Sequence, residues 1–207
     1  MTTADRLTMT LGEAMFTQRA IRRLKPDPIP DDVMRDIMEG AIRAPNGGNT
    51  QQWHFIVVKD AELRRQLGEL YHEAWWAKRK DAGINGPEDI PPGKNSLRSA
   101  MRLANEFGSV PVMVLICATA KGPDAAAAII PSAQNMLLAA RAFGIGGTIA
   151  TLHPVPSEPV CAERVVCDKQ VLGKTTPDAA DCVALKVVGE DSVPERKRHL
   201  QPVCRSI

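Results

Sequence analysis

Apolar residues recur at three- and four-residue intervals in several stretches of the chain, and this spacing predicts amphipathic helices. The first predicted helix begins at Asp31, directly after Pro30, and ends before Pro45. A second helix is predicted over 61–70, where leucines repeat at the same spacing. The buried face of the first helix is expected to consist of Val33, Met34, Ile37, Met38, Ala41 and Ile42.

A third, longer helix is predicted in the second half of the chain. It begins at a cap provided by Asp124 and runs to about Phe143. Gly144 follows in the usual position of a left-handed helix cap. The chain then resumes in residues 146–151, which are expected to form a strand directly after this helix.

Short apolar runs bounded by turn residues predict further strands at 55–58, 110–118 and 182–188. A polar loop rich in Gly and Asn, residues 46–53, leads into the first of these strands. Residues 75–95 combine paired tryptophans with Gly, Pro and charged residues and show no sustained period, so we interpret them as a mobile cover or insertion. Since no repeat or linker divides the chain, we expect one α+β domain over residues 1–207.

The composition is that of an ordinary globular protein. The 207 residues are 44% hydrophobic and 24% charged, with a net charge of +2, which is too small to favour bulk attraction to nucleic acid or membranes. No apolar segment resembles a secretory signal or is long enough to cross a bilayer. The five cysteines lack the two-residue spacing of zinc or redox pairs, so a reduced, cytoplasmic location is expected.

Two segments carry candidate ligand-binding residues. Several arginines gather in residues 19–25, and converging guanidinium groups can hold a phosphate through forked hydrogen bonds. A solvated basic face is the alternative interpretation of this segment. The 46–53 loop offers side-chain amides and close backbone approach to a flat heteroaromatic ligand, although a plain turn also explains its glycines. Arg196 and Arg198 are a second set of cations, or a solubilising tail.

Two common nucleotide-binding motifs are excluded. Gly93-Lys94 lacks the glycine spacing of a P-loop, and Asn95 stands where that loop has a metal-binding Ser or Thr. The glycines at 144–147 end a helix and precede a strand, which is the reverse of the order in a Rossmann dinucleotide motif.

The order of the remaining motifs resembles the nitroreductase family of flavin mononucleotide (FMN) enzymes. Arg19-Ala20-Ile21-Arg22 is similar to the family's Arg-Ser-x-x-Arg-like segment, and residues 45–53 are similar to its Pro-Ser-x-x-Asn-x-Gln-Pro-Trp segment. Residues 134–146 resemble the family's long central helix with its glycine end. The resemblance covers about residues 15–155, and residues 156–207 are atypical apart from the basic run Pro194-Glu195-Arg196-Lys197-Arg198.

This resemblance implies a three-layer α+β fold, with a central, mostly antiparallel sheet flanked by helices, and a homodimer that binds FMN at the subunit interface. It implies that NADH or NADPH reduces the flavin and that a nitroaromatic, quinone or similar small organic acceptor reoxidises it in a ping-pong cycle. The chemistry would take place at flavin N5, with no metal and no certain catalytic side chain. No nucleic-acid or membrane partner is implied.

The resemblance also assigns site residues by position. Those expected at the phosphate are Arg19, Ala20, Arg22 and Arg23, with Arg196 or Arg198. Those expected at the ring and ribityl chain are Pro45, Asn46, Gly47 and Asn49, and along the pyrimidine side Thr151, Leu152 and His153. In the cover, residues 71–95, Trp75 and Trp76 are candidates for stacking on the substrate; the alternative is that one is a core residue and the other lies on the dimer surface.

The sequence is also compatible with a second functional interpretation. Ala20 replaces the family's serine and removes a hydroxyl from the phosphate site, and the match weakens after Pro156. These departures are compatible with a flavin-binding, flavin-storage or regulatory protein that keeps the cofactor site without efficient turnover. Within the enzyme class, the sequence does not distinguish NADH from NADPH, FMN from a deazaflavin, or one acceptor from another.

Overall fold

The computed structural model describes residues 2–118, 123–150 and 182–190. Its centre is a four-stranded sheet with the order β1-β2-β4-β3, formed by β1 (Trp53–Val58), β2 (Val112–Ala118), β3 (Ile145–Ala150) and β4 (Cys182–Glu190). All three strand pairs are antiparallel. The predicted mostly antiparallel α+β fold is therefore confirmed, with strands at the four predicted places.

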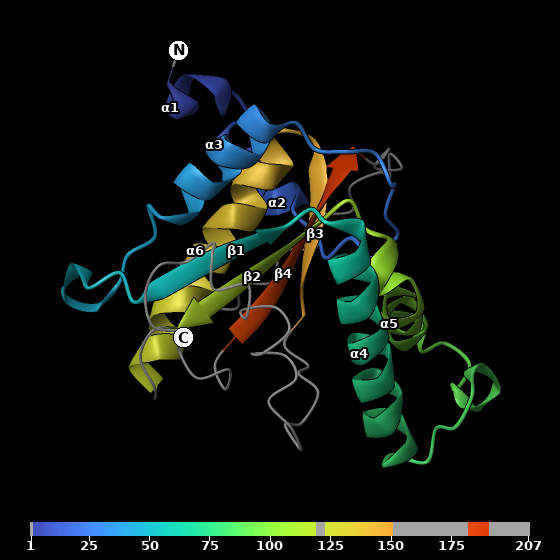
Figure 1. Cartoon of the computed structure of the whole chain (residues 1–207). Coiled ribbons are helices and arrows are strands. Elements are labelled where there is room, and N and C mark those ends of the chain that lie inside the picture. Colours follow the sequence, from blue (N-terminus) through green and yellow to red (C-terminus); the bar gives the residue numbers. More distant parts are fainter. Residues whose placement is uncertain (1, 119–122, 151–181, 191–207) are drawn as a thin grey trace, which may run out of the picture.

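Two helices cover one face of the sheet. These are α3 (Asp31–Ala41) and α6 (Pro123–Ala142), which lie side by side in Figure 1. Alternate residues of β2, among them Val114 and Ile116, point into the core that these helices form with the sheet, and both are fully buried. Such alternation follows from the two-residue period of a strand. Gly40 of α3 permits close packing of the two helices, because a Cβ there would lie 3.0 Å from Ala139 Cβ.

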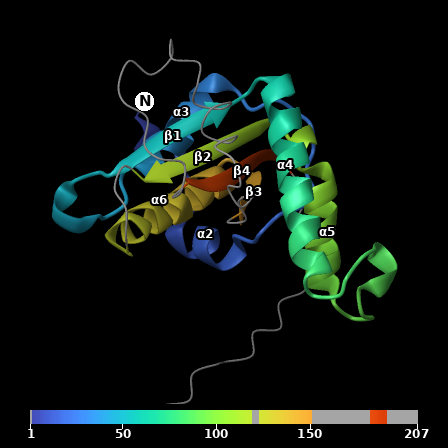
Figure 2. The same cartoon turned by 60° about the horizontal axis from the view of Figure 1, so that its bottom comes forward.

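The opposite face is covered by α4 (Ala61–Lys80) and α5 (Asn95–Glu106), which run alongside each other in Figure 2. The second core lies beneath them, and Met113 of β2 contributes to it from the other side of the strand. Helix α4 also packs on η3 (Phe107–Ser109), which directly follows α5, and Gly68 of α4 approaches the backbone of Gly108 there. A Cβ on Gly68 would lie 2.4 Å from Gly108 N, so only glycine fits this crossing.

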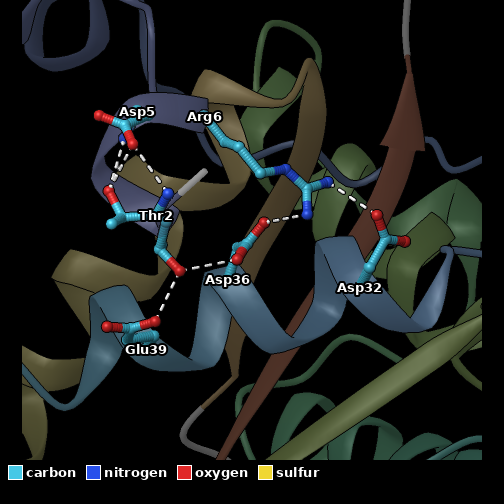
Figure 3. A network of polar contacts seen from close by, with 7 residues as sticks. Thr2, Asp5, Arg6, Asp32, Asp36 and Glu39 are labelled. Carbon is cyan, nitrogen blue, oxygen red and sulfur yellow. Dashed lines mark hydrogen bonds and ion pairs between the residues drawn. The ribbon is translucent and has the colours of Figure 1, made fainter.

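Two short helices precede α3, namely α1 (Thr3–Arg6) and α2 (Leu11–Thr17). Polar contacts fasten α1 to α3, as Figure 3 shows: Arg6 forms ion pairs with Asp32 and Asp36, at 2.8 and 2.7 Å. Thr3 Oγ1 lies 2.7 Å from Asp36 Oδ1 and 2.6 Å from Glu39 Oε2. The Thr3 and Arg43 side chains both lower the pKa of Glu39 by stabilising its charged form.

Several predicted boundaries were wrong. The helix predicted over 61–70 continues to Lys80 and includes both Trp75 and Trp76, so that part of the predicted cover is regular structure. Arg, Lys and His side chains on its outer face had obscured the helical period. Helix α6 begins at Pro123, so Asp124 lies within its first turn and is not its cap. Helix α5 and the short helices η1 (Gly47–Asn49) and η2 (Pro87–Asp89) were not predicted at all.

Candidate functional site

The arginine-rich segment after α2 is attached to an edge of the sheet. Ala20 forms a parallel bridge with Gly147 of β3, and the Ile21 amide donates a hydrogen bond of 3.0 Å to the Gly147 carbonyl. Gly146 makes this approach possible, since a Cβ at that position would lie 2.9 Å from the Ile21 side chain. The backbone therefore fixes the position of the arginines relative to β3.

This attachment divides the predicted phosphate-binding residues between two cavities. Arg19 lines a small cavity of about 30 Å³, together with Arg141 at the end of α6 and the glycines of residues 144–147. Arg22 and Arg23 line a separate cavity of about 220 Å³, whose other wall is α5. The three arginines predicted to form one phosphate site thus line two different cavities.

The guanidinium groups of this segment are available for a ligand. Arg19 Nη1 donates to the backbone carbonyl of Gln18 at 2.7 Å, and Arg141 Nε donates to Thr17 Oγ1 at 3.0 Å. Within the described part of the chain, Arg19, Arg22 and Arg23 form no ion pair with a carboxylate. An anionic ligand can therefore supply the negative charge that no described carboxylate provides to these three arginines.

The Asn- and Gly-rich loop before β1 has a shape set by its own side chains. Asn46 Oδ1 accepts a hydrogen bond of 2.8 Å from the Gln51 amide, which closes the loop around η1. Gly48 has φ +59°, and Asn49 and Gln51 also have positive φ angles, 53° and 50°. Residues other than Gly rarely adopt this left-handed region, and Asn tolerates it better than most. Local strain of this kind is typical of functional loops.

The arginine segment and this loop lie at diagonally opposite corners of the sheet. Ala20, Gly147, Val187 and Val112 form one row across the strands, and the row continues to the C-terminal end of β1. Four strand spacings of about 4.8 Å separate Ala20 from β1 by about 19 Å. The loop precedes the other end of β1, so the separation along the strand adds to this distance. Figure 1 shows the two segments on opposite sides of the molecule.

The two candidate substrate residues differ in exposure. Trp75 is 3% exposed, and its ring packs edge-on against Trp76, with the guanidinium of Arg79 over its face at 5.3 Å. Trp76 is half-buried, and its indole Nε1 donates to Asn105 Oδ1 at 3.4 Å. Within a single chain, Trp76 is therefore the ring with surface left for a ligand, and Trp75 is a packing residue. A contact of either ring with a substrate remains a prediction.

Some predicted site residues lie outside the described residues, namely Thr151, Leu152, His153, Arg196 and Arg198. Three further arginines, which the sequence did not single out, line the two cavities. Arg98 and Arg102 lie one turn apart on α5, and Arg141 lies in the last turn of α6. The four-residue spacing of Arg98 and Arg102 was the available signal, but it is informative only once residues 95–106 are identified as a helix.

Tyr71 of α4 is another residue that the sequence analysis did not single out. Its ring stacks on Phe107, with ring centroids 4.1 Å apart. Burial raises the pKa of Tyr71, and the positive charges of Arg22 and Arg79 partly oppose that shift. Arg22 therefore stands near the stacked pair between α4 and η3, on the side of the sheet that carries α5.

The match to a protein-family model decides which family this chain belongs to. Residues 16–175 match the model of the nitroreductase family. The chain belongs to the nitroreductase family. It is 28% identical over 140 residues to an NADH dehydrogenase/NAD(P)H nitroreductase of Archaeoglobus fulgidus. That alignment covers 68% of this chain and 66% of the relative, so the chain spans just under two thirds of the relative's length.

Solved structures of the nitroreductase family share the fold. An FMN-bound nitroreductase from Desulfitobacterium hafniense superposes with a TM-score of 0.64 at 20% identity, covering 94% of this chain and 96% of its own. An oxidised iodotyrosine deiodinase bound to FMN and 3-iodo-L-tyrosine gives a TM-score of 0.66 at 17% identity, covering 95% and 98%. The predicted family and fold are therefore confirmed, whereas the reactions of these neighbours differ from one another.

The described residues lack two kinds of feature. No helix among them is long and apolar enough to cross a membrane. They also contain no group of three or more His, Cys, Asp or Glu side chains placed to hold a metal ion.

Proposed function

We propose that this protein is an FMN-dependent oxidoreductase that passes electrons from NADH or NADPH, in a ping-pong cycle, to a nitroaromatic, quinone or similar small organic acceptor. The flavin, when bound, supplies the hydride chemistry. The observation that carries the proposal is the attachment of the arginine segment to β3 through Ala20 and Gly147, in a chain that belongs to the nitroreductase family. The FMN-bound members that share the fold support the choice of cofactor.

The residues of the arginine segment fit the phosphate end of FMN. Arg19 is exposed beside the first cavity, and Arg22 is half-buried beside the second, so an anion at Ala20 can be approached from both sides. Charge-assisted hydrogen bonds from guanidinium groups are shorter and stronger than neutral ones. The missing serine hydroxyl at Ala20 is offset by these arginines, and Arg23, Arg196 and Arg198 remain predicted contributors.

The ring end of FMN requires a second subunit. The loop that carries Pro45, Asn46, Gly47 and Asn49 lies at the far corner of the sheet from Ala20, so one chain does not bring both sets of residues to one small ligand. In a two-fold symmetric dimer, the arginines of one subunit meet the loop of the other, and two identical sites form. Thr151, Leu152 and His153 are proposed along the pyrimidine side.

Exposed apolar residues support this dimer. Leu11, Met15 and Phe16 on α2 are 70%, 58% and 72% exposed, and Ile130 on α6 is 58% exposed. Exposed apolar side chains that gather on one short helix, as three do on α2, are typical of protein interfaces. A second copy of the chain that covers α2 would bury these side chains and would bring its own loop toward the neighbouring arginine segment.

The first test is the visible absorption spectrum of the purified protein, before and after anaerobic addition of NADH or NADPH. Flavin bands that bleach with the reductant, and return when 4-nitrobenzoate or a quinone is added, support the oxidoreductase. Bands that never bleach favour flavin storage without turnover. A colourless protein that takes up no added FMN contradicts the proposal.

The shared site is tested by mixing two inactive variants. Arg19→Gln damages the phosphate end of each site, and Asn49→Ala damages the ring end. If each site takes Arg19 from one subunit and Asn49 from the other, a mixed dimer contains one intact site and one doubly damaged site. Refolding the variants together then restores about a quarter of the flavin sites, as expected for isologous pairing at random. No recovery, with mixed dimers demonstrated, contradicts the shared site.

A further inference from the structure

The larger of the two cavities is lined entirely by polar and basic side chains. Its residues are Arg22, Arg23, Asn95, Arg98, Ser99 and Arg102, and its volume is about 220 Å³. Ligand sites for whole drug-sized molecules are usually larger, about 300–1,000 Å³, and are mostly apolar. The size and lining of this cavity therefore suit a charged group of a ligand better than an entire ligand.

The wall formed by α5 is a single polar stripe. Asn95, Arg98, Ser99 and Arg102 are spaced at three and four residues, so they project from one face of the helix. Ala104 projects from the opposite face and is 1% exposed, and Leu103, which is 3% exposed, lies beside the stripe. Two like charges four residues apart destabilise a helix, so the stripe is not explained by the stability of α5 itself.

Four guanidinium groups share this cavity without a carboxylate among its lining residues. Elsewhere in the described part of the chain, Arg6, Arg43 and Arg65 each form an ion pair with Asp or Glu. Arg22, Arg23, Arg98 and Arg102 form none with any described carboxylate. Concentrated positive charge that the described carboxylates leave uncompensated attracts anions from solution, and Asn95 and Ser99 add neutral hydrogen-bond donors.

One of these arginines is held in place. Arg98 Nη2 donates a hydrogen bond of 3.1 Å to the backbone carbonyl of Ile90, whose side chain is 1% exposed. This bond ties the start of α5 to the segment that follows η2. Among the described residues, the other donors of this guanidinium have no hydrogen-bond partner. The cavity wall is therefore partly preorganised, which lowers the entropic cost of binding.

We propose that this cavity, here named the arginine pocket, binds the phosphate or carboxylate group of a substrate, so that the protein selects anionic substrates. The inference rests on the proposed function and refines it. FMN's own phosphate is assigned to Arg19, Ala20 and Arg22, with Arg23 as a predicted contributor. Arg98 and Arg102, on the α5 wall of the pocket, are therefore left for a second anion. That anion belongs either to NADPH, through its 2′-phosphate, or to an acceptor bearing an acidic group.

Direct binding of inorganic pyrophosphate tests the arginine pocket without catalysis. Isothermal titration calorimetry on the full chain, saturated with FMN, compares wild type with Arg98→Gln and Arg102→Gln. Losing one charge-assisted hydrogen bond is expected to weaken binding about ten-fold. Arg35→Gln, an exposed change of the same charge on α3, is the matched control and leaves the affinity within about two-fold.

Two results would overturn the assignment. Unchanged pyrophosphate affinity in both variants would show that the arginine pocket binds no anion. Loss of FMN from either variant, with the fold intact by circular dichroism, would show that the pocket holds the flavin instead. Pyrophosphate binding that is lost in Arg19→Gln and kept in Arg98→Gln and Arg102→Gln would place the anion in the flavin's phosphate site, which also contradicts the proposal.

Steady-state kinetics then identify the substrate that carries the anion. A rise of KM for NADPH and not for NADH, with kcat unchanged, assigns the arginine pocket to the 2′-phosphate. A rise of KM for 4-nitrobenzoate and not for neutral 4-nitrobenzamide assigns it to the acceptor. An effect on neither substrate rejects a role in substrate selection. If the protein binds no flavin, the proposed function fails, but the pyrophosphate titration on the flavin-free chain still tests the pocket.

Discussion

Gly146 of β3 faces Ile21 so closely that a Cβ on the glycine would lie 2.9 Å from the Ile21 side chain. Gly146→Ala should therefore push the arginine segment away from β3, at a cost of about 1–3 kcal/mol from overpacking. We expect FMN affinity to fall in this variant, because Arg19 and Arg22 flank Ile21. Flavin fluorescence titration measures the affinity, and urea unfolding measures the stability.

Gly12→Ala is the control for this prediction. Gly12 lies in α2, where a Cβ would meet nothing within 4 Å, so the substitution adds a methyl group without a clash. FMN affinity should stay at the wild-type value in a variant that size-exclusion chromatography shows to form the same oligomer, since α2 belongs to the proposed dimer surface. If Gly146→Ala also keeps wild-type affinity while its stability falls, the close approach of Ile21 serves the fold alone.

The ion pairs between α1 and α3 should contribute unequally to the stability of the protein. The Asp36 side chain is 9% exposed and pairs with Arg6, whereas Asp32, which pairs with the same guanidinium, is 62% exposed. Arg6→Gln leaves the Asp36 carboxylate buried without its cation, and we expect a loss of about 2–3 kcal/mol, since removing one partner of a buried pair is costly.

Asp32→Asn breaks only the exposed half of the fork and should cost much less than Arg6→Gln, because solvent screens an exposed pair. Urea unfolding of both variants, monitored by circular dichroism, makes the comparison. Equal losses in Arg6→Gln and Asp32→Asn would mean that burial of Asp36 contributes nothing to the pairing.

The regular elements of this protein were more predictable than its site. Helix α3 and the four strands follow from their apolar patterns. Helix α3 buries one face, and the continuous apolar run of β2 supplies Val114 to one core and Met113 to the other. The prediction ended helix α4 too early, at residue 70. The second half of this helix presents charged residues on most of its surface, and it buries Trp75 in a contact that no local pattern reveals. The pairing of Ala20 with Gly147 joins residues 127 positions apart, so only the folded chain divides Arg19 and Arg22 between two cavities.

Acid should destabilise the protein through its exposed ion pairs. Hydrogen bonds from Arg65 and Gln66 lower the pKa of Glu62 to about 2 from its ordinary value of 4.5, and Arg6 similarly lowers the pKa of Asp32. A carboxylate whose pKa is lower in the folded state stabilises that state above its unfolded pKa, and this contribution is lost as the pH falls. For Glu62 the loss is expected between about pH 4.5 and 2.

Urea unfolding at a series of pH values tests this expectation. Glu62→Gln removes the titrating group, so it should lower the stability at pH 7 and make the stability less dependent on pH between 4.5 and 2. High salt should also make the stability of the wild-type protein less dependent on pH, because salt screens exposed ion pairs. A variant with the wild-type pH dependence would show that Glu62 has the same pKa in the folded and unfolded chains.

The two neighbouring tryptophans of α4 should separate packing from substrate contact. Trp75 is 3% exposed, so Trp75→Ala creates a large cavity and should cost about 3–5 kcal/mol of stability. Trp76 is half-buried, and Trp76→Ala should cost less stability while it removes the ring that retains a free surface.

We expect Trp76→Ala to raise acceptor KM and to leave the spectrum of bound flavin unchanged. Trp76→Phe, which keeps an aromatic face but loses the donor to Asn105, should restore most of the KM. Loss of flavin from Trp76→Ala, or an unchanged KM in a stable variant, would instead assign the ring to packing.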